Sequence, residues 1–386
     1  QNKIVRFKNI VFMYVIENKD EKNTTLSDFV IYKKDGDKAW EKGASFPTSR
    51  PGNILIDSKG ILHTFVFEPL NVLKNDSWGK LKHYWFTDAY LGDITNYKEE
   101  TVVDNNGTAE TVNIRIGTAI GEDDTMAIGF GLTKFNPLYN GHSEHLYFKK
   151  PSDTKWQHLV AGQNLGHDYY YPFVWVGQNS FLLLPVQDDF ADDGNPQTYD
   201  NIYQKIAYFE YKDSLWRQDL IIDHTKHPLA STRNRIVEQE DLFVENNGTI
   251  HILYKENTDP NDRFLTHHVH LSKKLGEEKW QEEKLNLPTI INCVRLFEVD
   301  NTLYFFANSW DSQYLARLNS QKLVKLPISG AIGIYPYVAT KRGGTKDSPF
   351  IDILLLAADS ETFKKETNFN YYLRIHKDDL AKLTSF

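Results

Sequence analysis

Aromatic rings, arginines and histidines gather in three short stretches of this sequence. Residues 166–175 hold His167 followed by three tyrosines, Arg233 and Arg235 stand two residues apart, and His142 lies in a third, polar stretch. Rings stack on the CH faces of sugars, guanidinium forks hold carboxylates through two hydrogen bonds, and His titrates nearest neutral pH. This combination predicts a site that binds an acidic sugar and carries an acid or a base.

An internal repeat indicates which elements hold these residues. Residues 54–67 form an apolar run, a polar turn and a second apolar run, and residues 242–254 repeat this layout, with His63 and His251 each following the Gly turn. Weaker copies lie at 9–16, 114–130, 173–185, 294–306 and 337–356. Self-similarity at a regular spacing is typical of repeat folds, and these copies predict seven units of about 55 residues.

A second pattern follows most copies: an amphipathic strand, a short charged turn and a Trp. It occurs at 29–40, 145–156, 206–216 and 268–280; Tyr97 takes the place of Trp in the second unit, and the last two units lack it. Each is a hairpin in which the Trp opens the outer strand. Four antiparallel strands per unit predict an all-β, seven-bladed β-propeller that forms a single domain over residues 1–386. Two β-sandwich domains are the alternative. The best helical pattern is short, at 377–383.

In such a propeller the loops that enter the innermost strand and the loops between the second and third strands share one face, the predicted mouth. We expect the site there, between the third, fourth and fifth blades. Hairpins on the opposite face, such as 33–38 and 149–155, read as solvated Lys and Asp turns. The substrate-binding candidates are Arg50, Arg115, Tyr169, Tyr170, Arg233 and Tyr335.

Several histidines and acids have competing interpretations. His63 and His251 occupy the same place in the repeat, which favours a repeated structural role over a catalytic one. His268 and His270 alternate on one strand face, for which a solvent-facing strand is favoured over metal binding. Residues 187–195 have the oxygen ligands of a Ca²⁺ site without EF-hand spacing. We therefore assign no metal ligands and expect no required cofactor, with Ca²⁺ as the alternative.

Composition limits the function classes. The 386 residues carry a net charge of −8 and no Lys/Arg run, which argues against nucleic acid and anionic membranes as partners. No apolar run approaches the roughly 18 residues of a membrane helix, so we expect no membrane insertion. The single Cys293 excludes an internal disulfide framework. Because residue 1 is Gln, we expect a removed leader and a secreted, periplasmic or cell-surface monomer.

The blade layout and the Gly166-His-Asp-Tyr-Tyr-Tyr-Pro-Phe-Val-Trp175 stretch resemble the secreted bacterial neuraminidase-repeat propellers that include the ulvan lyases. The apolar strand at 181–185, the acidic loop at 188–195 and the Tyr-rich strand at 206–211 extend this likeness. The chain is also similar to propellers that act on rhamnose linked to glucuronate. The resemblance implies an acidic polysaccharide or oligosaccharide as the partner and a mouth site built from His, Tyr and Arg.

The favoured reaction is β-elimination next to a uronic acid, which makes the chain a polysaccharide lyase. Arg235 would neutralise the carboxylate, His142 or His167 would act as base, and Tyr171 or Tyr203 would act as acid. One alternative is an exo-glycoside hydrolase, similar to a rhamnosidase, for which two carboxylates among Glu68, Asp188 and Glu256 are the candidates. A non-catalytic glycan-binding propeller is the other alternative.

Overall fold

The computed structural model describes most of the chain. The described residues are 2–18, 27–48, 52–70, 79–105, 110–112, 116–136, 139–164, 169–189, 202–223, 237–257, 266–288, 291–309, 312–320, 322–327, 333–346, 348–357 and 369–384. At several strand ends within these ranges only the backbone is described.

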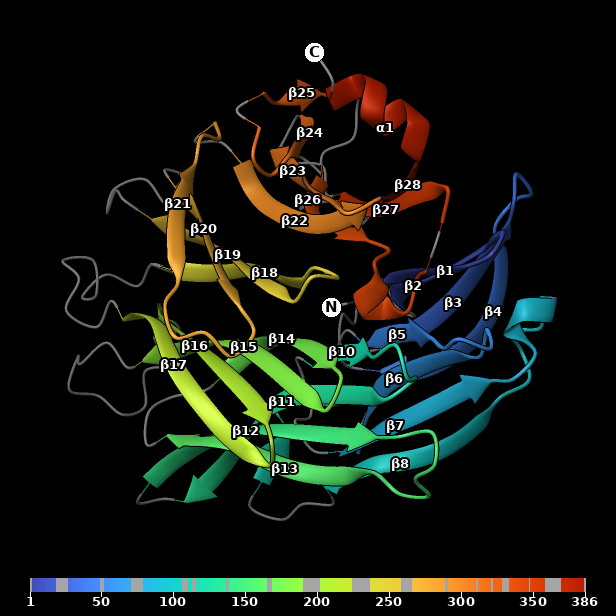
Figure 1. The fold of residues 1–386 in the computed structure, drawn as a ribbon. Helices are drawn as coiled ribbons and strands as arrows, with labels where there is room; N and C mark the ends of the chain where they lie inside the picture. The colour runs from blue at the N-terminus through green and yellow to red at the C-terminus, as the bar shows by residue number, and fades with distance from the viewer. Residues whose placement is uncertain are drawn as a thin grey trace. The chain divides into compact units, whose positions relative to one another are not determined.

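Seven successive antiparallel sheets make up the fold (Figure 1), and each is built from strands that follow one another in the chain. This is the seven-bladed β-propeller predicted from the repeat, and it excludes two sandwiches. Six sheets contain four strands in sequence order, one of them with an added strand, and three strands of the seventh are described. The predicted Trp positions are confirmed: Trp40, Trp156 and Trp280 directly precede an outer strand, and Trp216 is the second residue of one.

Two compact units divide the chain. Unit 1 comprises Gln1–Asp189, Ala207–Ile221 and Lys341–Asp347, and unit 2 comprises Phe190–Ile206, Ile222–Thr340 and Ser348–Phe386. Blades 1 to 4 belong almost wholly to unit 1 and blades 5 to 7 to unit 2. The prediction of a single domain stays a prediction.

Unit 1 contains the first four blades and two short 3₁₀ helices. Blade 1 is β1 (Ile4–Phe7), β2 (Ile10–Asn18), β3 (Ser27–Asp35) and β4 (Glu41–Thr48). Blade 2 is β5 (Asn53–Ile56), β6 (Leu62–Pro69), β7 (Gly79–Phe86) and β8 (Lys98–Asn105), with η1 (Ala89–Leu91) between β7 and β8. Blade 3 is β9 (Glu110–Val112), β10 (Gly117–Ile120), β11 (Met126–Asn136), β12 (Tyr139–Lys149) and β13 (Gln157–Asn164). Blade 4 is β14 (Tyr169–Gly177), β15 (Ser180–Asp189), β16 (Ile202–Lys212) and β17 (Leu215–Asp223), and η3 is Lys341–Gly343.

Unit 2 contains the last three blades and the described α-helix. Blade 5 is β18 (Val237–Val244), β19 (Thr249–Asn257), β20 (Thr266–Lys274) and β21 (Gln281–Leu285). Blade 6 is β22 (Ile291–Val299), β23 (Thr302–Ser309), β24 (Gln313–Arg317) and β25 (Val324–Lys325). Blade 7 is β26 (Gly333–Val338), β27 (Phe350–Ala357) and β28 (Phe369–His376), followed by α1 (Lys377–Thr384) where the helix was predicted.

Hydrophobic cores lie between successive sheets of each unit. Alternate strand residues face opposite sides of a sheet, so a blade packed on both sides needs apolar residues on both. In unit 1, Phe12 and Phe29 of blade 1 pack with Phe86 of blade 2. In unit 2, Phe306 of blade 6 packs with Leu380 of α1. Within the described ranges no helix is long and apolar enough to cross a membrane.

Candidate functional site

The structure places the predicted site residues unevenly. Tyr335 is described with its side chain, which is half-buried at the start of β26. Only the backbone is described for five candidates. They are His142 in β12, Tyr169, Tyr170 and Tyr171 in β14, and Tyr203 in β16. Five others lie outside the described residues: Arg50, Arg115, His167, Arg233 and Arg235. Most of the acidic stretch considered for Ca²⁺, residues 190–195, also lies outside them.

His142 was expected in a mouth loop between a second and a third strand, but it lies in a strand. It belongs to β12, where its backbone pairs with Thr133 of β11 and Asn164 of β13. Tyr169 and Tyr170 likewise pair within the sheet, opposite Gln187 and Val186 of β15. The strands extend further toward the predicted mouth than the apolar pattern suggested, because polar residues satisfy a β-ladder as well as apolar ones do.

The inner strands of blades 4 to 7 each carry a β-bulge near the end where they begin. The irregularities fall at Tyr171 and Pro172 in β14, Glu240 in β18, Asn292 in β22 and Ile334 in β26. We call this end of a blade, where the first strand begins and the second ends, its entrance end. A bulge leaves one residue unpaired and re-aims its side chain, and bulges are frequent beside functional sites.

In unit 2 the blade 5 bulge presents Glu240 to a histidine. Glu240 Oε2 lies 2.7 Å from His268 Nδ1, and His268 Nε2 lies 3.2 Å from the carbonyl oxygen of Ile291 in blade 6. Glu240 and His268 are 2% exposed, so His268 is not on a solvent-facing strand, contrary to the prediction. Both ring nitrogens face protein oxygens, and His268 therefore joins two blades of unit 2.

Two cations lie beside this pair. Lys255 Nζ is 3.1 Å from Glu238 Oε2 and donates to the carbonyl oxygen of Asn292 at 2.9 Å. Burial opposes its charge, but Glu238, Glu240 and the neighbouring Tyr335 outweigh burial and raise the pKa of Lys255. Lys255 is therefore a permanent cation and cannot act as a base.

Arg295 and Asp241 fasten the same region. Arg295 donates to the carbonyl oxygens of Glu240 and Val294. Asp241 accepts from the backbone N–H of Leu242 at 2.9 Å and from that of Leu296 at 2.8 Å. Burial raises the pKa of nearby Cys293 to about 12, so this free cysteine is a protonated thiol rather than a nucleophile.

These groups form the entrance cluster of unit 2, defined as Glu238, Glu240, Lys255, His268, Arg295 and Tyr335. Lys255, Glu238 and Tyr335 keep partial solvent access and place an ion pair and a phenol at this end of unit 2. Tyr335 was predicted from the sequence, whereas Glu238, Glu240 and Lys255 were not. The available signal was the Glu-Gln-Glu-Asp run, 238–241, within an inner strand that should be apolar.

Unit 1 holds one buried acid near the position of His142. Glu144 of β12 is fully buried, and neither carboxylate oxygen has a hydrogen-bond partner among the described residues. Burial raises the pKa of Glu144 well above its usual range. Its charged form is therefore disfavoured in the folded protein.

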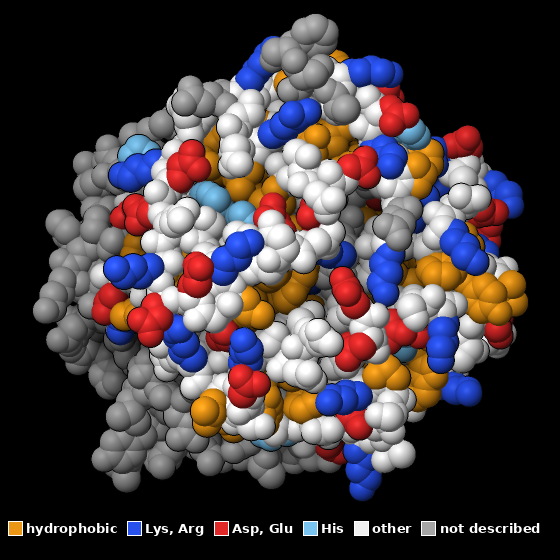
Figure 2. Space-filling view, viewed as in Figure 1, with side chains coloured by type: hydrophobic (Ala, Val, Ile, Leu, Met, Phe, Trp, Pro, Cys, Tyr) orange, Lys and Arg blue, Asp and Glu red, His pale blue; other side chains and the backbone are white. Residues whose placement is uncertain are grey.

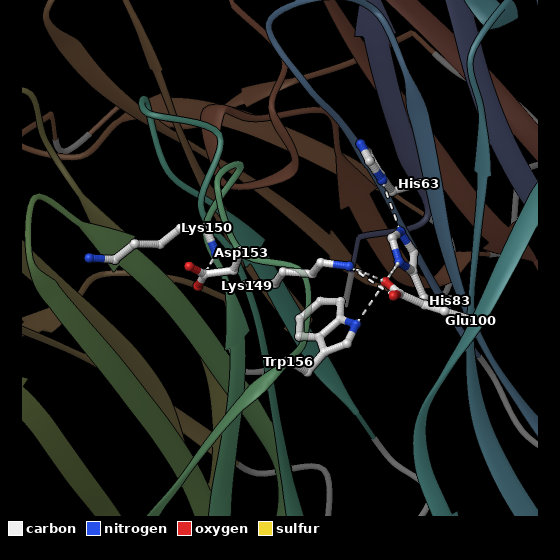
Figure 3. Close-up of polar contacts among 7 residues, drawn as sticks. All are labelled: His63, His83, Glu100, Lys149, Lys150, Asp153 and Trp156. Carbon is white, nitrogen blue, oxygen red and sulfur yellow. Dashed lines mark hydrogen bonds and ion pairs between the residues drawn. The ribbon is translucent and has the colours of Figure 1, made fainter.

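The other end of blades 2 and 3 carries a histidine network (Figure 3). His63 Nδ1 and His83 Nε2 are 2.9 Å apart, and His83 Nδ1 lies 2.9 Å from Glu100 Oε1. From blade 3, Lys149 reaches both oxygens of Glu100 at 2.8 Å and Trp156 Nε1 donates to it at 3.0 Å. Lys149 is thus bound in an ion pair, whereas the rest of its hairpin, residues 150–155, is largely exposed, as predicted.

Blade 5 repeats this arrangement. His251 Nδ1 and His270 Nε2 are 2.9 Å apart, and Glu245 and Glu283 lie 3.6 Å and 3.8 Å from the outer nitrogens of the pair. Burial lowers the pKa of His83, His251 and His270 to about 4. The repeated structural role predicted for His63 and His251 agrees with this geometry, and His270 is buried rather than solvent-facing. No group of three or more His, Cys, Asp and Glu in the described part of the chain could hold a metal ion.

Neither a protein-family model nor a curated protein matches this sequence. Solved structures do match. A polysaccharide lyase described as PL25 ulvan lyase has a TM-score of 0.60 at 10% identity, over 100% of this chain and 95% of that chain. The same type of lyase bound to -[GlcA(1-4)Rha3S]- has a TM-score of 0.59 at 11% identity, over 99% and 95%. An acylaminoacyl peptidase of Pyrococcus horikoshii has a TM-score of 0.51 at 8% identity, over 97% and 51%.

These likenesses define the class of the protein: it is a β-propeller. Its fold is that of the ulvan lyases along the whole chain, and the resemblance inferred from the sequence is confirmed at this level. The peptidase shares the fold with a different chemistry, so the reaction has to be argued from side chains.

Proposed function

We propose that this chain is a carbohydrate-active enzyme that cleaves a uronic-acid-containing polysaccharide by β-elimination. The observation that carries the proposal is the similarity to ulvan lyase, which extends over 100% of this chain and 95% of the other. The complex of such a lyase with a glucuronate-containing oligosaccharide supports an acidic glycan as substrate.

The reaction assigns three roles. Arg235 neutralises the uronate carboxylate and so acidifies the C5 proton, and His142 or His167 removes that proton. The C4–O bond breaks as the C4–C5 double bond forms, and Tyr171 or Tyr203 protonates the departing oxygen. No water enters the products. Six side chains are proposed to hold the substrate: Arg50, Arg115, Tyr169, Tyr170, Arg233 and Tyr335.

The entrance cluster of unit 2 offers polar groups to a sugar substrate. Glu238 and Glu240 outweigh the effect of burial and raise the pKa of Lys255, and Glu238 pairs with its ammonium at 3.1 Å. An ion pair beside a phenol suits a sugar that carries several hydroxyls. The cluster adds binding capacity and no general base.

The decisive assay is digestion of ulvan while the ultraviolet absorbance of the unsaturated uronate is followed. We expect absorbance to rise with cleavage, and His142→Ala or His167→Ala to lower the rate by about 10²- to 10⁴-fold. His376→Ala is the matched control, because His376 is a partly exposed residue of blade 7 beside Asp378. Chain cleavage without unsaturated product would refute the lyase.

Product mass and binding stoichiometry separate the alternatives. A hydrolase adds one water to its products, which would favour release of a terminal sugar with carboxylates as acid and base. A glycan-binding propeller would bind several equivalent sugars per chain without cleavage. We further propose an extracellular monomer that needs no cofactor; loss of activity on chelation, restored by Ca²⁺, would contradict the last point.

A further inference from the structure

A pocket lies in unit 1 at the end of blades 1 and 2 opposite their entrance ends. Its volume is about 470 Å³, a size that suits a sugar unit. The turn between β1 and β2, the hairpin between β3 and β4, and the connection that contains η1 form its walls. The hairpin at 33–38, predicted to be a solvated turn, is therefore one side of a pocket.

The apolar wall is partly exposed. Tyr90 is 41% exposed and Leu91 is 71% exposed, and both line the pocket. The connection that carries them, residues 87–97, is longer than the described hairpins between third and fourth strands in the other blades. Exposed rings and aliphatic side chains gathered in one place mark a binding surface more often than scattered ones do.

Phe7 completes this wall and is held close to Tyr90. A Cβ added to Gly60 would lie 2.6 Å from the Phe7 ring and 2.8 Å from Tyr90 Cβ, so Gly60 leaves just enough room for the two to approach. Gly60 also has a φ of +82°, which favours glycine. In Figure 2 hydrophobic side chains lie together with lysines over this part of blades 1 and 2.

Lysines supply the polar side of the pocket. Lys33 is 3.0 Å from Glu41 and donates to the carbonyl oxygen of Gly92, and Lys38 is 2.6 Å from Asp35. Lys8 differs, because its Nζ lies 5.1 Å from the centre of the Phe7 ring and no carboxylate pairs with it among the described residues. Its ammonium is thus available to an anion, on a protein whose net charge is −8.

The pocket is preformed. The bond from Lys33 to Gly92 joins blade 1 to the blade 2 connection, and Ala44 N donates to the carbonyl oxygen of Ile94 at 2.9 Å. Arg6 Nη1 donates to the carbonyl oxygen of Lys8 at 3.1 Å. This bond holds the turn that presents the Lys8 ammonium to the pocket. A ligand therefore does not have to order these walls, which lowers the entropic cost of binding.

We propose that this pocket is a second, non-catalytic binding site for an acidic sugar unit of the polysaccharide. Phe7 and Tyr90 contact the CH face of the sugar, and Lys8 binds its carboxylate or sulfate. The proposal rests on the proposed function for the identity of the glycan. The pocket would hold one part of a long polysaccharide chain while another part reacts. The proposal therefore predicts that the pocket raises affinity for long substrates only.

The test uses Tyr90→Ala and Lys8→Ala, with Tyr371→Ala as the matched control because Tyr371 is a 36% exposed tyrosine of blade 7. Binding of ulvan, measured by affinity electrophoresis, is expected to weaken about three- to tenfold in the first two variants and to be unchanged in the control. KM for the polymer should rise while kcat and the rate on short oligosaccharides stay constant. Carboxyl-reduced, desulfated ulvan should bind Lys8→Ala and the unchanged protein equally.

The outcomes separate this proposal from the proposed function. Weakened ulvan binding in the two variants of a protein that cleaves nothing would support the pocket and refute the lyase. Unchanged ulvan binding and KM in both variants of an active lyase would overturn the pocket. Equal losses on polymer and on short oligosaccharides would also overturn it, because they would indicate damage to the reacting site.

Discussion

Acid should destabilise this protein through its buried histidines, and His83 offers the sharpest test. The pKa of His83 falls from 6.5 to about 4 on folding, chiefly because burial disfavours the imidazolium, although Glu100 partly opposes this. The unfolded chain therefore binds the proton more tightly than the folded protein does. The contribution of neutral His83 to stability is complete above the pKa that His83 has in the unfolded chain. It is lost as pH falls from that value toward about 4.

The magnitude follows from linkage. At about pH 5, His83 is almost fully protonated in the unfolded chain and mostly neutral in the folded protein. The free energy of unfolding is therefore about 2 kcal/mol lower than at neutral pH. His251 and His270 bond to each other and titrate as a pair. The histidines of blades 2 and 5 together should therefore lower the free energy of unfolding by roughly 4 to 6 kcal/mol. This is a large share of the 5 to 15 kcal/mol that holds a typical domain.

His83→Phe isolates one contribution. The ring keeps its stacking on Phe65 and Trp85, and Glu100 keeps Lys149 and Trp156 as partners. The variant should have a lower free energy of unfolding than the unchanged protein at neutral pH. Between about pH 7 and about pH 5 its free energy of unfolding should fall by about 2 kcal/mol less than that of the unchanged protein. His267→Phe, at an exposed position of the same residue type, is the control.

Urea unfolding followed by tryptophan fluorescence measures this directly, since Trp85 and Trp156 both contact the His83 ring. The free energy of unfolding is determined at each pH for the three proteins. If the curves of His83→Phe and the unchanged protein run parallel, the histidine does not titrate on unfolding and the reasoning is wrong.

Three further predictions concern buried polar groups. Glu144→Gln should be more stable than the unchanged protein at neutral pH and equal to it near about pH 4, because the raised pKa of Glu144 makes the folded state lose stability as pH rises; a constant difference between the two urea curves would contradict this. Asp241→Ala should cost about 2 to 4 kcal/mol in urea unfolding because two backbone N–H groups lose their acceptor. Lys377→Ala, which breaks an exposed pair with Asp300, should cost less than about 1 kcal/mol. Cys293, protonated and buried, should react with a thiol reagent only as fast as the protein unfolds, and immediate labelling of the folded protein would argue against its burial.

The sequence by itself determined the sheet architecture. The inner strands of the blades are mostly buried, so they are apolar runs separated by Gly and Asp turns. The repeat of this pattern, with Trp40, Trp156, Trp216 and Trp280, is visible without coordinates. The matched places of His63 and His251 also predicted their common role. Local signals suffice here because hairpins join residues that are close in the chain.

Only the tertiary structure decided which polar residues meet. Glu240 reaches His268 because a bulge turns it out of the strand alternation, and Asp241 bonds to Leu296, 55 residues away in the next blade. Phe7, Lys8 and Tyr90 share a pocket although they come from the hairpins of two different blades. Alternation and spacing describe one strand or one hairpin, whereas the register and bulges that bring two blades together depend on packing that no local pattern records.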